Sequence, residues 1–335
     1  MLEKHVSNRR CLQSRPRFAL TILVFIAILA VVIPPAVVVT LHKKNDMGPK
    51  AKVFVPLYVY PAPGAWSPLE DVYVLPTFQP LSSVCRSAQR HLDVIMGFDL
   101  LHQAQLSHHR ISKHPDVNFT VVINPGSGPG PNALPDANYT REIPRLASYE
   151  NVRLLGYVAT TYAKRNISLV RKDIETYAAW PANSSNPDLA VRGIFFDETP
   201  QQYDEGALAY LQELTDVVKN TPGLGPDHYV VHNPGAIPDS RYLSTADSTV
   251  VFEATYATFQ ERHGANLFTA IPESNRSQLC AVIHSVPESV EGSALRGLVK
   301  QVRKVAEEIF ITHLNTDYYA SFGGQWPAFV DLMAK

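Results

Sequence analysis

The sequence has only three cysteines and almost no net charge, −1 over 335 residues. A protein that binds nucleic-acid phosphates needs a basic face, so this charge balance argues against a nucleic-acid binder. Cys11, Cys85 and Cys280 are too few to build a fold on disulfides, and stability has to come from a hydrophobic core. With 45% hydrophobic residues, the chain can form one large domain or two ordinary ones.

Motifs typical of dinucleotide binding, of serine hydrolases and of metalloproteases are absent or incomplete. Gly126–Gly130 resembles a phosphate loop, but it lacks the third glycine of the dinucleotide spacing and its prolines prevent a helix start. No Gly-x-Ser-x-Gly elbow occurs. His228 and His232 lie in a strand context without the glutamate of a metalloprotease helix, so core or rim histidines are expected. A loose histidine group is not expected to hold a functional metal: His102, His108, His109 and His114. The sequence predicts neither a metal nor a cofactor.

One long uncharged run lies near the N-terminus. Residues 18–41 contain 24 positions without a charge, which as a helix would span about 36 Å, enough to cross a bilayer core. Five basic residues precede the run, and a short Arg-rich tail usually stays cytoplasmic. We expect a single-pass type II membrane protein with a cytoplasmic tail at 1–17, a signal-anchor at 18–41 and a linker at 42–52. The alternative is a cleaved signal peptide, whose apolar region ends at Pro34–Pro35.

In both cases the rest of the chain is exported. Five N-glycosylation sequons agree with export, and they begin at Asn118, Asn138, Asn166, Asn183 and Asn275. In an oxidising compartment Cys85 and Cys280 could form a disulfide. These features predict a glycoprotein that is displayed outside the cell or secreted.

Eight short apolar runs of strand type recur beyond the linker, at 53–60, 119–125, 152–159, 191–198, 228–234, 249–256, 279–286 and 308–314. Segments with helical spacing lie between most of them, at 141–150, 168–180, 207–220 and 294–308. Near-continuous apolar strands that alternate with helices indicate a parallel sheet covered on both faces. Eight such units predict a (β/α)8 barrel over 53–335, with a doubly wound sheet as the main alternative.

Polar and aromatic residues follow these runs almost every time, where a barrel of this type carries its site. For a single residue, a satisfied cap is the ordinary explanation; the whole set is typical of a ring of sugar contacts. The acidic members are Asp197, Glu198 and Glu253, and the predicted substrate contacts are Tyr58, Tyr60, Asn124, Tyr157, Asn233, Tyr256 and His284.

Carboxylates and aromatic residues at a barrel mouth suit glycoside hydrolysis, which needs one protonated carboxyl group and one ionised carboxylate. Adjacent strand residues point to opposite faces, so only one of Asp197 and Glu198 should face the centre. Glu253 on the sixth strand is its natural partner. Exposed tyrosines offer flat apolar faces to sugar rings.

Several segments resemble the spherulin-4-like (spherulation-specific) family: VPLYVYPAPGAWSPL (55–69), FTVVINPGSGPGP (119–131), GYVATTYAKR (156–165), GIFFDETP (193–200), VVFEATYATF (250–259) and IFITHLNTDYYASFGGQW (309–326). Its members in glycoside hydrolase family 135 are fungal (β/α)8 enzymes that cleave α-1,4-linked galactosaminogalactan, a cell-wall polysaccharide that contains N-acetylgalactosamine. The resemblance implies an exported, endo-acting hydrolase that we expect to be a monomer. A non-catalytic polysaccharide-binding protein on the same barrel is the alternative.

The resemblance places the family's acidic trio at Asp197, Glu198 and Glu253, with Glu198 expected to hold hydrogen bonds and balance charge. Asp197 and Glu253 fall on strands two apart, about 9–10 Å between backbones at about 4.8 Å per strand. Inward-leaning side chains would leave the carboxyl gap between the retaining value near 5.5 Å and the inverting range from about 6.5 Å, so the spacing does not decide. The short Asp197 suits a fixed nucleophile and the longer Glu253 a proton donor, and retention is therefore expected.

The chain departs from the family between residues 72 and 111, where about forty residues intervene. A lid beside the first strand is one interpretation of this insertion. A tolerated surface insertion, or a retained intron in the gene, is the other.

Overall fold

The computed structural model describes residues 47–69, 111, 113–271 and 273–335. Contact clustering divides the chain into Met1–Met47 and Gly48–Lys335, and the second unit is the one described below. The predicted tail 1–17, the segment 18–41, Cys11 and Cys85 lie outside the described residues. No helix among the described residues is long and apolar enough to cross a membrane.

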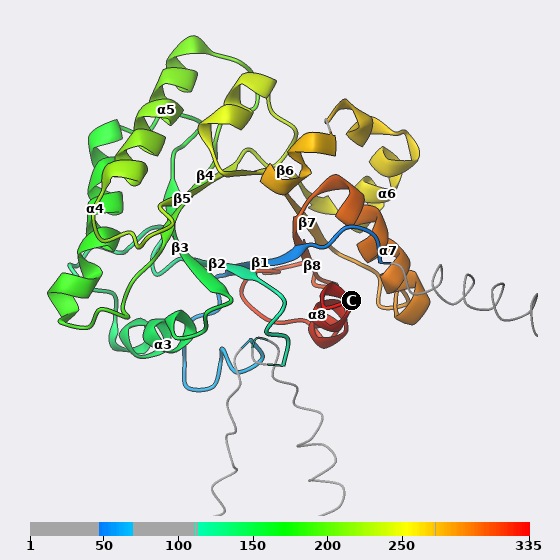
Figure 1. Cartoon of the computed structure of the whole chain (residues 1–335), viewed down its shortest axis with the longest axis horizontal. Helices are drawn as coiled ribbons and strands as arrows, with labels where there is room; N and C mark the ends of the chain where they lie inside the picture. The colour runs from blue at the N-terminus through cyan, green and yellow to red at the C-terminus, as the bar shows by residue number, and fades with distance from the viewer. Residues whose placement is uncertain (1–46, 70–110, 112, 272) are drawn as a thin grey trace, which may run out of the picture. The chain divides into compact units, whose positions relative to one another are not determined.

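Eight parallel strands form a closed barrel in the order of the chain (Figure 1). They are β1 Lys52–Leu57, β2 Phe119–Ile123, β3 Val152–Ala159, β4 Gly193–Asp197, β5 Tyr229–Asn233, β6 Ser248–Thr255, β7 Leu279–His284 and β8 Glu308–Ile311. The barrel closes where β1 pairs with β8, with Lys52 opposite Glu308 and Val53 opposite Ile309. The predicted (β/α)8 barrel is confirmed, and a doubly wound sheet is excluded.

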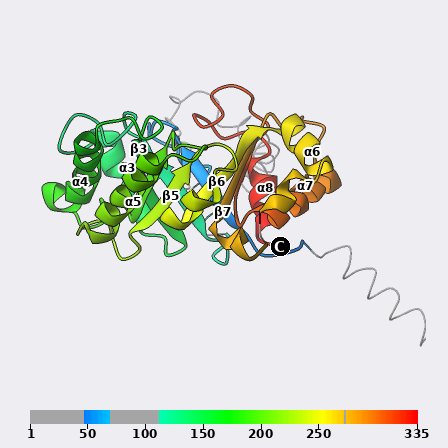
Figure 2. The ribbon, with the colours of Figure 1, turned by 90° about the horizontal axis from the view of Figure 1, so that it is seen from above.

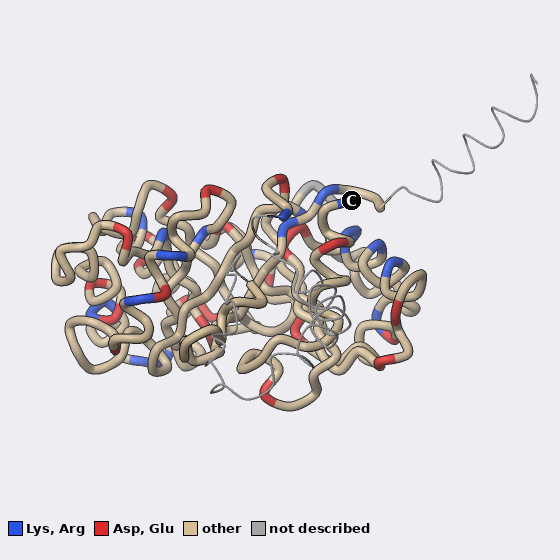
Figure 3. The backbone as a smooth tube through the Cα atoms, turned by 90° about the horizontal axis from the view of Figure 1, so that it is seen from below, with Lys and Arg blue, Asp and Glu red and all other residues tan. Residues whose placement is uncertain are grey.

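Helices lie outside the ring of strands in both ribbon views (Figures 1 and 2). They are α3 Ala137–Ala147, α4 Ile167–Ser184, α5 Glu205–Asn220, α6 Tyr256–Gly264, α7 Gly292–Val305 and α8 Trp326–Met333. Three short 3-10 helices complete the described elements: η1 Ser240–Thr245, η2 Leu267–Ala270 and η3 Glu273–Gln278. Acidic and basic residues are both spread over the backbone in Figure 3.

Several predicted boundaries differ from the observed ones, and two of the differences have a clear local reason. Helix α3 starts earlier than the predicted residue 141, because the Asp136 side chain accepts hydrogen bonds from the amides of Asn138 and Tyr139 and caps a start at Ala137. Strand β6 ends at Thr255, whose side chain accepts from Thr258 N and caps α6. Tyr256 is therefore the first residue of a helix and not the last of a strand.

Tight packing of helix α4 on the barrel depends on Gly156 in β3. A Cβ atom at that position would lie 2.7 Å from the ring of Tyr177, which is fully buried. The Tyr177 hydroxyl donates to the carbonyl oxygens of Ile123 and Tyr157, at 3.2 and 3.1 Å. Gly156 thus allows a helix side chain to reach two strands and satisfy their carbonyls from outside the barrel.

A bulge in β6 sets the direction of Glu253. Val250 pairs with Cys280 and Phe252 pairs with the next residue, Ala281, so the register shifts around Val251. Bulges of this kind bend a strand and redirect a side chain, often beside an active site. The Glu253 amide donates to Gly235 O at 3.0 Å, outside the regular ladder, which holds the redirected strand.

Leu69, shortly before the predicted insertion 72–111, lies beside Ile111, the last residue of that insertion. Ile111 is buried and its amide donates to Leu69 O at 3.4 Å. The chain therefore returns to the barrel close to the point where it leaves, a geometry in which extra residues are added at small entropic cost. Apart from Ile111, the insertion lies outside the described residues.

Candidate active site

Asp197 is the last residue of β4 and its carboxylate is held by three donors. Oδ2 accepts from the hydroxyl of Tyr157 on β3, at 2.8 Å. Oδ1 accepts from Asn233 Nδ2 on β5 and from the amide of Glu198, both at 2.9 Å. Because both neighbouring strands supply a donor, the Asp197 side chain is fixed at the mouth of the barrel.

Glu253 lies near the end of β6 and is held by two donors. The hydroxyl of Tyr319, in the loop after β8, donates to Oε1 at 2.6 Å. Asn233 Nδ2 donates to Oε2 at 2.8 Å. The donors thus come from elements on both sides of β6, and the carboxylate faces the same space as that of Asp197.

Asn233 connects the two acids and fixes their separation. Its Oδ1 accepts from Gly235 N at 2.9 Å, which orients the amide so that Nδ2 points at both carboxylates. Two acceptors on the two hydrogens of one nitrogen subtend about 120°, which places Asp197 Oδ1 and Glu253 Oε2 about 5 Å apart. The strand spacing alone left this gap undecided.

Glu198 follows β4 and has a left-handed backbone, with φ of 55°. Its carbonyl oxygen accepts from the Thr160 hydroxyl at 2.9 Å and from the Tyr162 amide at 2.6 Å. Within the described part of the chain its carboxylate forms no hydrogen bond that joins it to the pair. Glu198 bonds the pair through its backbone amide, which donates to Asp197 Oδ1, and the side-chain bonds to the pair come from Tyr157, Asn233 and Tyr319.

Burial raises the pKa of the Asp197 carboxyl group above its ordinary value of 3.8, and the charge of Glu253 adds to this. The hydrogen bonds from Tyr157, Glu198 N and Asn233 act in the opposite direction. Burial and the neighbouring charge therefore favour the protonated form of Asp197, while its three hydrogen-bond donors favour the ionised form.

Tyrosines around the pair stay protonated. Burial, followed by the charge of the nearby carboxylates, raises the pKa values of Tyr157 and Tyr319 well above 10.0. Burial and the same charges also raise the pKa of Tyr58. The Tyr58 ring lies edge-on to the rings of Tyr157 and Tyr319, with ring centres 5.7 and 5.2 Å apart. All three remain neutral hydrogen-bond donors when the carboxylates ionise.

The structure separates the predicted sugar contacts into two groups. Tyr58, Tyr157 and Asn233 surround the carboxylates. Two of the others bond within the protein: Asn124 Oδ1 accepts from Gly128 N at 3.0 Å, and the Tyr60 hydroxyl accepts from Asn138 Nδ2 at 2.7 Å. No ring contact or hydrogen bond joins Tyr256 to the pair within the described residues.

Two tyrosines near the carboxylates were not predicted, because the prediction considered only residues at the ends of the strands. Tyr319 holds Glu253, and Tyr318 stacks on His284 with ring centres 4.2 Å apart and planes 2° from parallel. Both tyrosines follow β8 by several residues and therefore lie beyond its strand end. Their signal was the aromatic pair Tyr318-Tyr319 inside the motif 309–326.

The predicted core histidine is confirmed at His232. Its side chain is 2% exposed, and burial lowers its pKa to about 3. His228 Nδ1 lies 3.0 Å from Val218 O and His114 Nε2 lies 2.8 Å from Asp331 Oδ1. No group of three metal-ligating side chains occurs among the residues that the structure describes.

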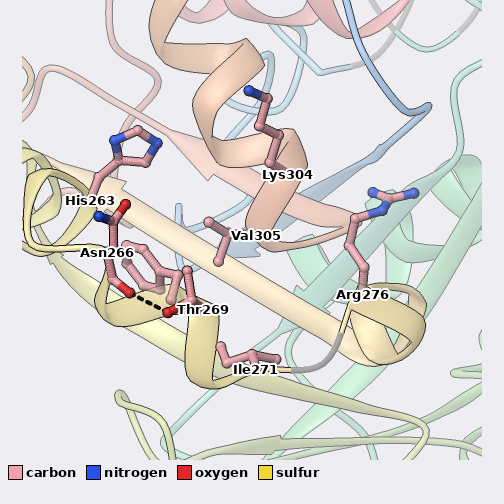
Figure 4. Close-up of a pocket in the computed structure, with 8 residues that line it drawn as sticks. His263, Asn266, Thr269, Ile271, Arg276, Lys304 and Val305 are labelled. Atoms are coloured by element: carbon pink, nitrogen blue, oxygen red, sulfur yellow. Dashed lines mark hydrogen bonds between the residues drawn. The ribbon is translucent and has the colours of Figure 1, made fainter.

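A pocket away from the carboxylates lies between α6, the connection to β7 and the end of α7 (Figure 4). The charged ends of Arg276 and Lys304 do not point toward one another there. Arg276 is already bonded to the carbonyl oxygens of Lys50, Arg303 and Ala306. Arg276 therefore holds the surrounding backbone in place, and we assign this pocket no ligand.

The candidate modification sites differ in access. Asn118, Asn166 and Asn183 are exposed, whereas Asn138 and Asn275 are half-buried. The Asn138 amide is engaged by Tyr60, and its Oδ1 accepts from Arg141 at 2.8 Å. Cys280 is a fully buried free thiol on β7, and because Cys85 lies outside the described residues, a bond between the two is not tested.

Fold and site together define a (β/α)8 barrel protein with a carboxylate pair at the C-terminal ends of its strands. Residues 105–333 match the spherulation-specific family 4, and the chain belongs to this family, as the motifs predicted. Spherulin-4 of Physarum polycephalum is 29% identical over 191 residues, which cover 56% of this chain and 53% of that protein. The chain thus spans about half the length of that curated relative. A solved structure, Aspergillus clavatus Sph3 in complex with GalNAc, is 75% identical with a TM-score of 0.72, covering 86% of this chain and 99% of that one.

Proposed function

We propose that the chain is an endo-acting glycoside hydrolase that cleaves α-1,4-linked, N-acetylgalactosamine-containing polysaccharide of the galactosaminogalactan type. The observation that carries the proposal is the pair Asp197 and Glu253, held on one amide of Asn233 at the strand ends. Two facing oxygens about 5 Å apart, as two acceptors on one nitrogen require, support the retaining arrangement. The 75% identity to Sph3, crystallised with GalNAc, supports the amino-sugar substrate.

In this mechanism Asp197 attacks the anomeric carbon while Glu253 gives its proton to the departing glycosidic oxygen. The bond to that oxygen breaks as an ester bond to Asp197 forms. Glu253, now ionised, accepts a proton from water, and the water oxygen displaces Asp197 from the anomeric carbon. Two inversions return the α configuration.

Three neighbours assist these steps. Tyr157 and Asn233 bond the Asp197 carboxylate and hold it for attack. The Tyr319 hydroxyl can donate to the ionised Glu253 or accept from the protonated one, so it serves both protonation states.

Release of oligosaccharides from purified galactosaminogalactan tests the activity. Wild type should release them, whereas Asp197→Asn and Glu253→Gln should not. If wild type binds the polymer without releasing any product, the non-catalytic alternative replaces this proposal. NMR of the first-formed product tests the stereochemistry: the α anomer is expected, and the β anomer would remove Asp197 as nucleophile.

We further propose that residues 18–41 anchor the chain with 1–17 in the cytoplasm and the barrel outside, unless the segment is cleaved. The uncharged run and the five sequons support this topology. In microsomes, the barrel should be glycosylated and protected from added protease. Digestion of the barrel from the cytoplasmic side would contradict the topology.

A further inference from the structure

A left-handed turn follows β3 at the mouth of the barrel. Thr161, Tyr162 and Ala163 have φ values of 50°, 55° and 62°. L-residues avoid this region because Cβ approaches the following carbonyl, and β-branched or bulky residues are found there least often. Three in succession persist only where the surrounding structure holds them, and such outliers concentrate at ligand sites.

The turn is tied directly to the two acids that end β4. Thr160 is fully buried, and its hydroxyl lies 2.9 Å from the carbonyl oxygens of Asp197 and Glu198. The Tyr162 amide donates to Glu198 O at 2.6 Å. On the far side, the Arg165 amide donates to Thr160 O at 3.1 Å and closes the turn.

Burial of Tyr162 does not account for this conformation. Its side chain is 56% exposed, and in the described part of the chain its ring meets no other ring and its hydroxyl has no hydrogen-bond partner. The neighbour Ala163 packs inward instead, against the cluster of Ala207, Leu211 and Tyr242. The turn therefore presents an exposed aromatic ring on a backbone that is bonded to the end of β4.

We propose that Tyr162 forms a sugar subsite on the β3 and β4 side of the mouth, where its ring stacks on the apolar face of a hexosamine unit of the bound polysaccharide. This subsite rests on the proposed function. A tyrosine suits the role because it offers a flat apolar body and a polar tip. The hydrogen bond from the Tyr162 amide to Glu198 O places the Tyr162 backbone beside the residue that follows Asp197.

Steady-state kinetics with Tyr162→Asn tests the subsite, because asparagine tolerates a left-handed backbone and removes the ring. We expect a five- to tenfold rise in KM for long polysaccharide, at about the strength of an aromatic contact, with kcat nearly unchanged. The effect should fall away as the oligosaccharide is shortened, and Tyr162→Phe should behave like wild type. Leu267→Asn is the matched control, since Leu267 is 53% exposed on η2, and it should change neither constant.

Binding separates this inference from the proposed function. In the Asp197→Asn background, calorimetry should show weaker polymer binding when Tyr162→Asn is added. If wild type cleaves the polymer but Tyr162→Asn leaves affinity and KM unchanged, the subsite is refuted and the hydrolase stands. An equal loss of kcat on short and long substrates would also refute it. If wild type neither cleaves nor binds the polymer, the proposed function and the subsite both fall.

Discussion

Replacing Asn233 by alanine should disable the site while leaving the barrel folded. The change removes both N–H donors, one at 2.9 Å from Asp197 and the other at 2.8 Å from Glu253. A hydrogen bond to a charged group contributes about 1.5–3 kcal/mol, and part of that contribution is common to ground and transition states. We therefore expect kcat to fall about 100- to 1,000-fold, or about 2.7–4 kcal/mol in activation free energy.

The same substitution also removes a loop bond, and a matched control separates that loss. Asn233 Oδ1 accepts from Gly235 N at 2.9 Å, and Asn186 Oδ1 accepts from Asp188 N at 3.0 Å in the connection before β4. Asn186→Ala should lose about 1 kcal/mol of unfolding free energy in urea, and Asn233→Ala should lose more because it also removes two bonds to carboxylates. Asn186→Ala should keep its kcat on oligosaccharide. If a folded Asn233→Ala keeps kcat within about threefold, the amide bridge does not organise the reaction.

Three further outcomes are expected. Tyr319→Phe should lower kcat about 10- to 100-fold with a small change in KM, since it removes the bond to the reacting Glu253; an unchanged kcat would contradict the role of Tyr319. Because burial raises the pKa of Asp197 from 3.8, the folded chain binds more protons than the unfolded chain above that pH. Wild-type stability should therefore fall as pH rises through the raised pKa, and urea titrations of Asp197→Asn should lack this part of the slope. Gly156→Ala should destabilise the fold by about 1–3 kcal/mol, because its Cβ would lie 2.7 Å from buried Tyr177; unchanged denaturation would show that α4 can shift.

Much of this architecture could be predicted because strand periodicity is a local property. Each of the eight apolar runs became a strand, and the strand-end rule led to Asp197, Asn233 and Glu253 together. Closure of the barrel then follows from strand number, since eight parallel strands with outer helices leave no free edge.

The distances within the site depend on contacts that are remote in the sequence. Tyr319 reaches Glu253 across 66 positions because the loop after β8 folds back over the mouth. In the sequence, Asn233 is one of several polar residues at strand ends. Its bond to Gly235 N, which the sequence does not indicate, turns Nδ2 toward Asp197 and Glu253. The backbone of Glu198 is left-handed through its loop contacts, which no residue preference of glutamate indicates.

Because of the bulge at Val251, the number of residues in β6 decides whether the Glu253 side chain faces the mouth of the barrel. Side chains alternate between the inside and the outside of a barrel, so one added residue exchanges the two sets beyond it. Phe252 packs on Phe259 and Phe268 outside the barrel, while Glu253 turns to Asn233 within it. Losing a single residue at this point would keep seven strands in place and turn the acid out of the mouth. On this fold, a barrel with two acids at its mouth and a barrel with one can therefore differ by a single residue in β6.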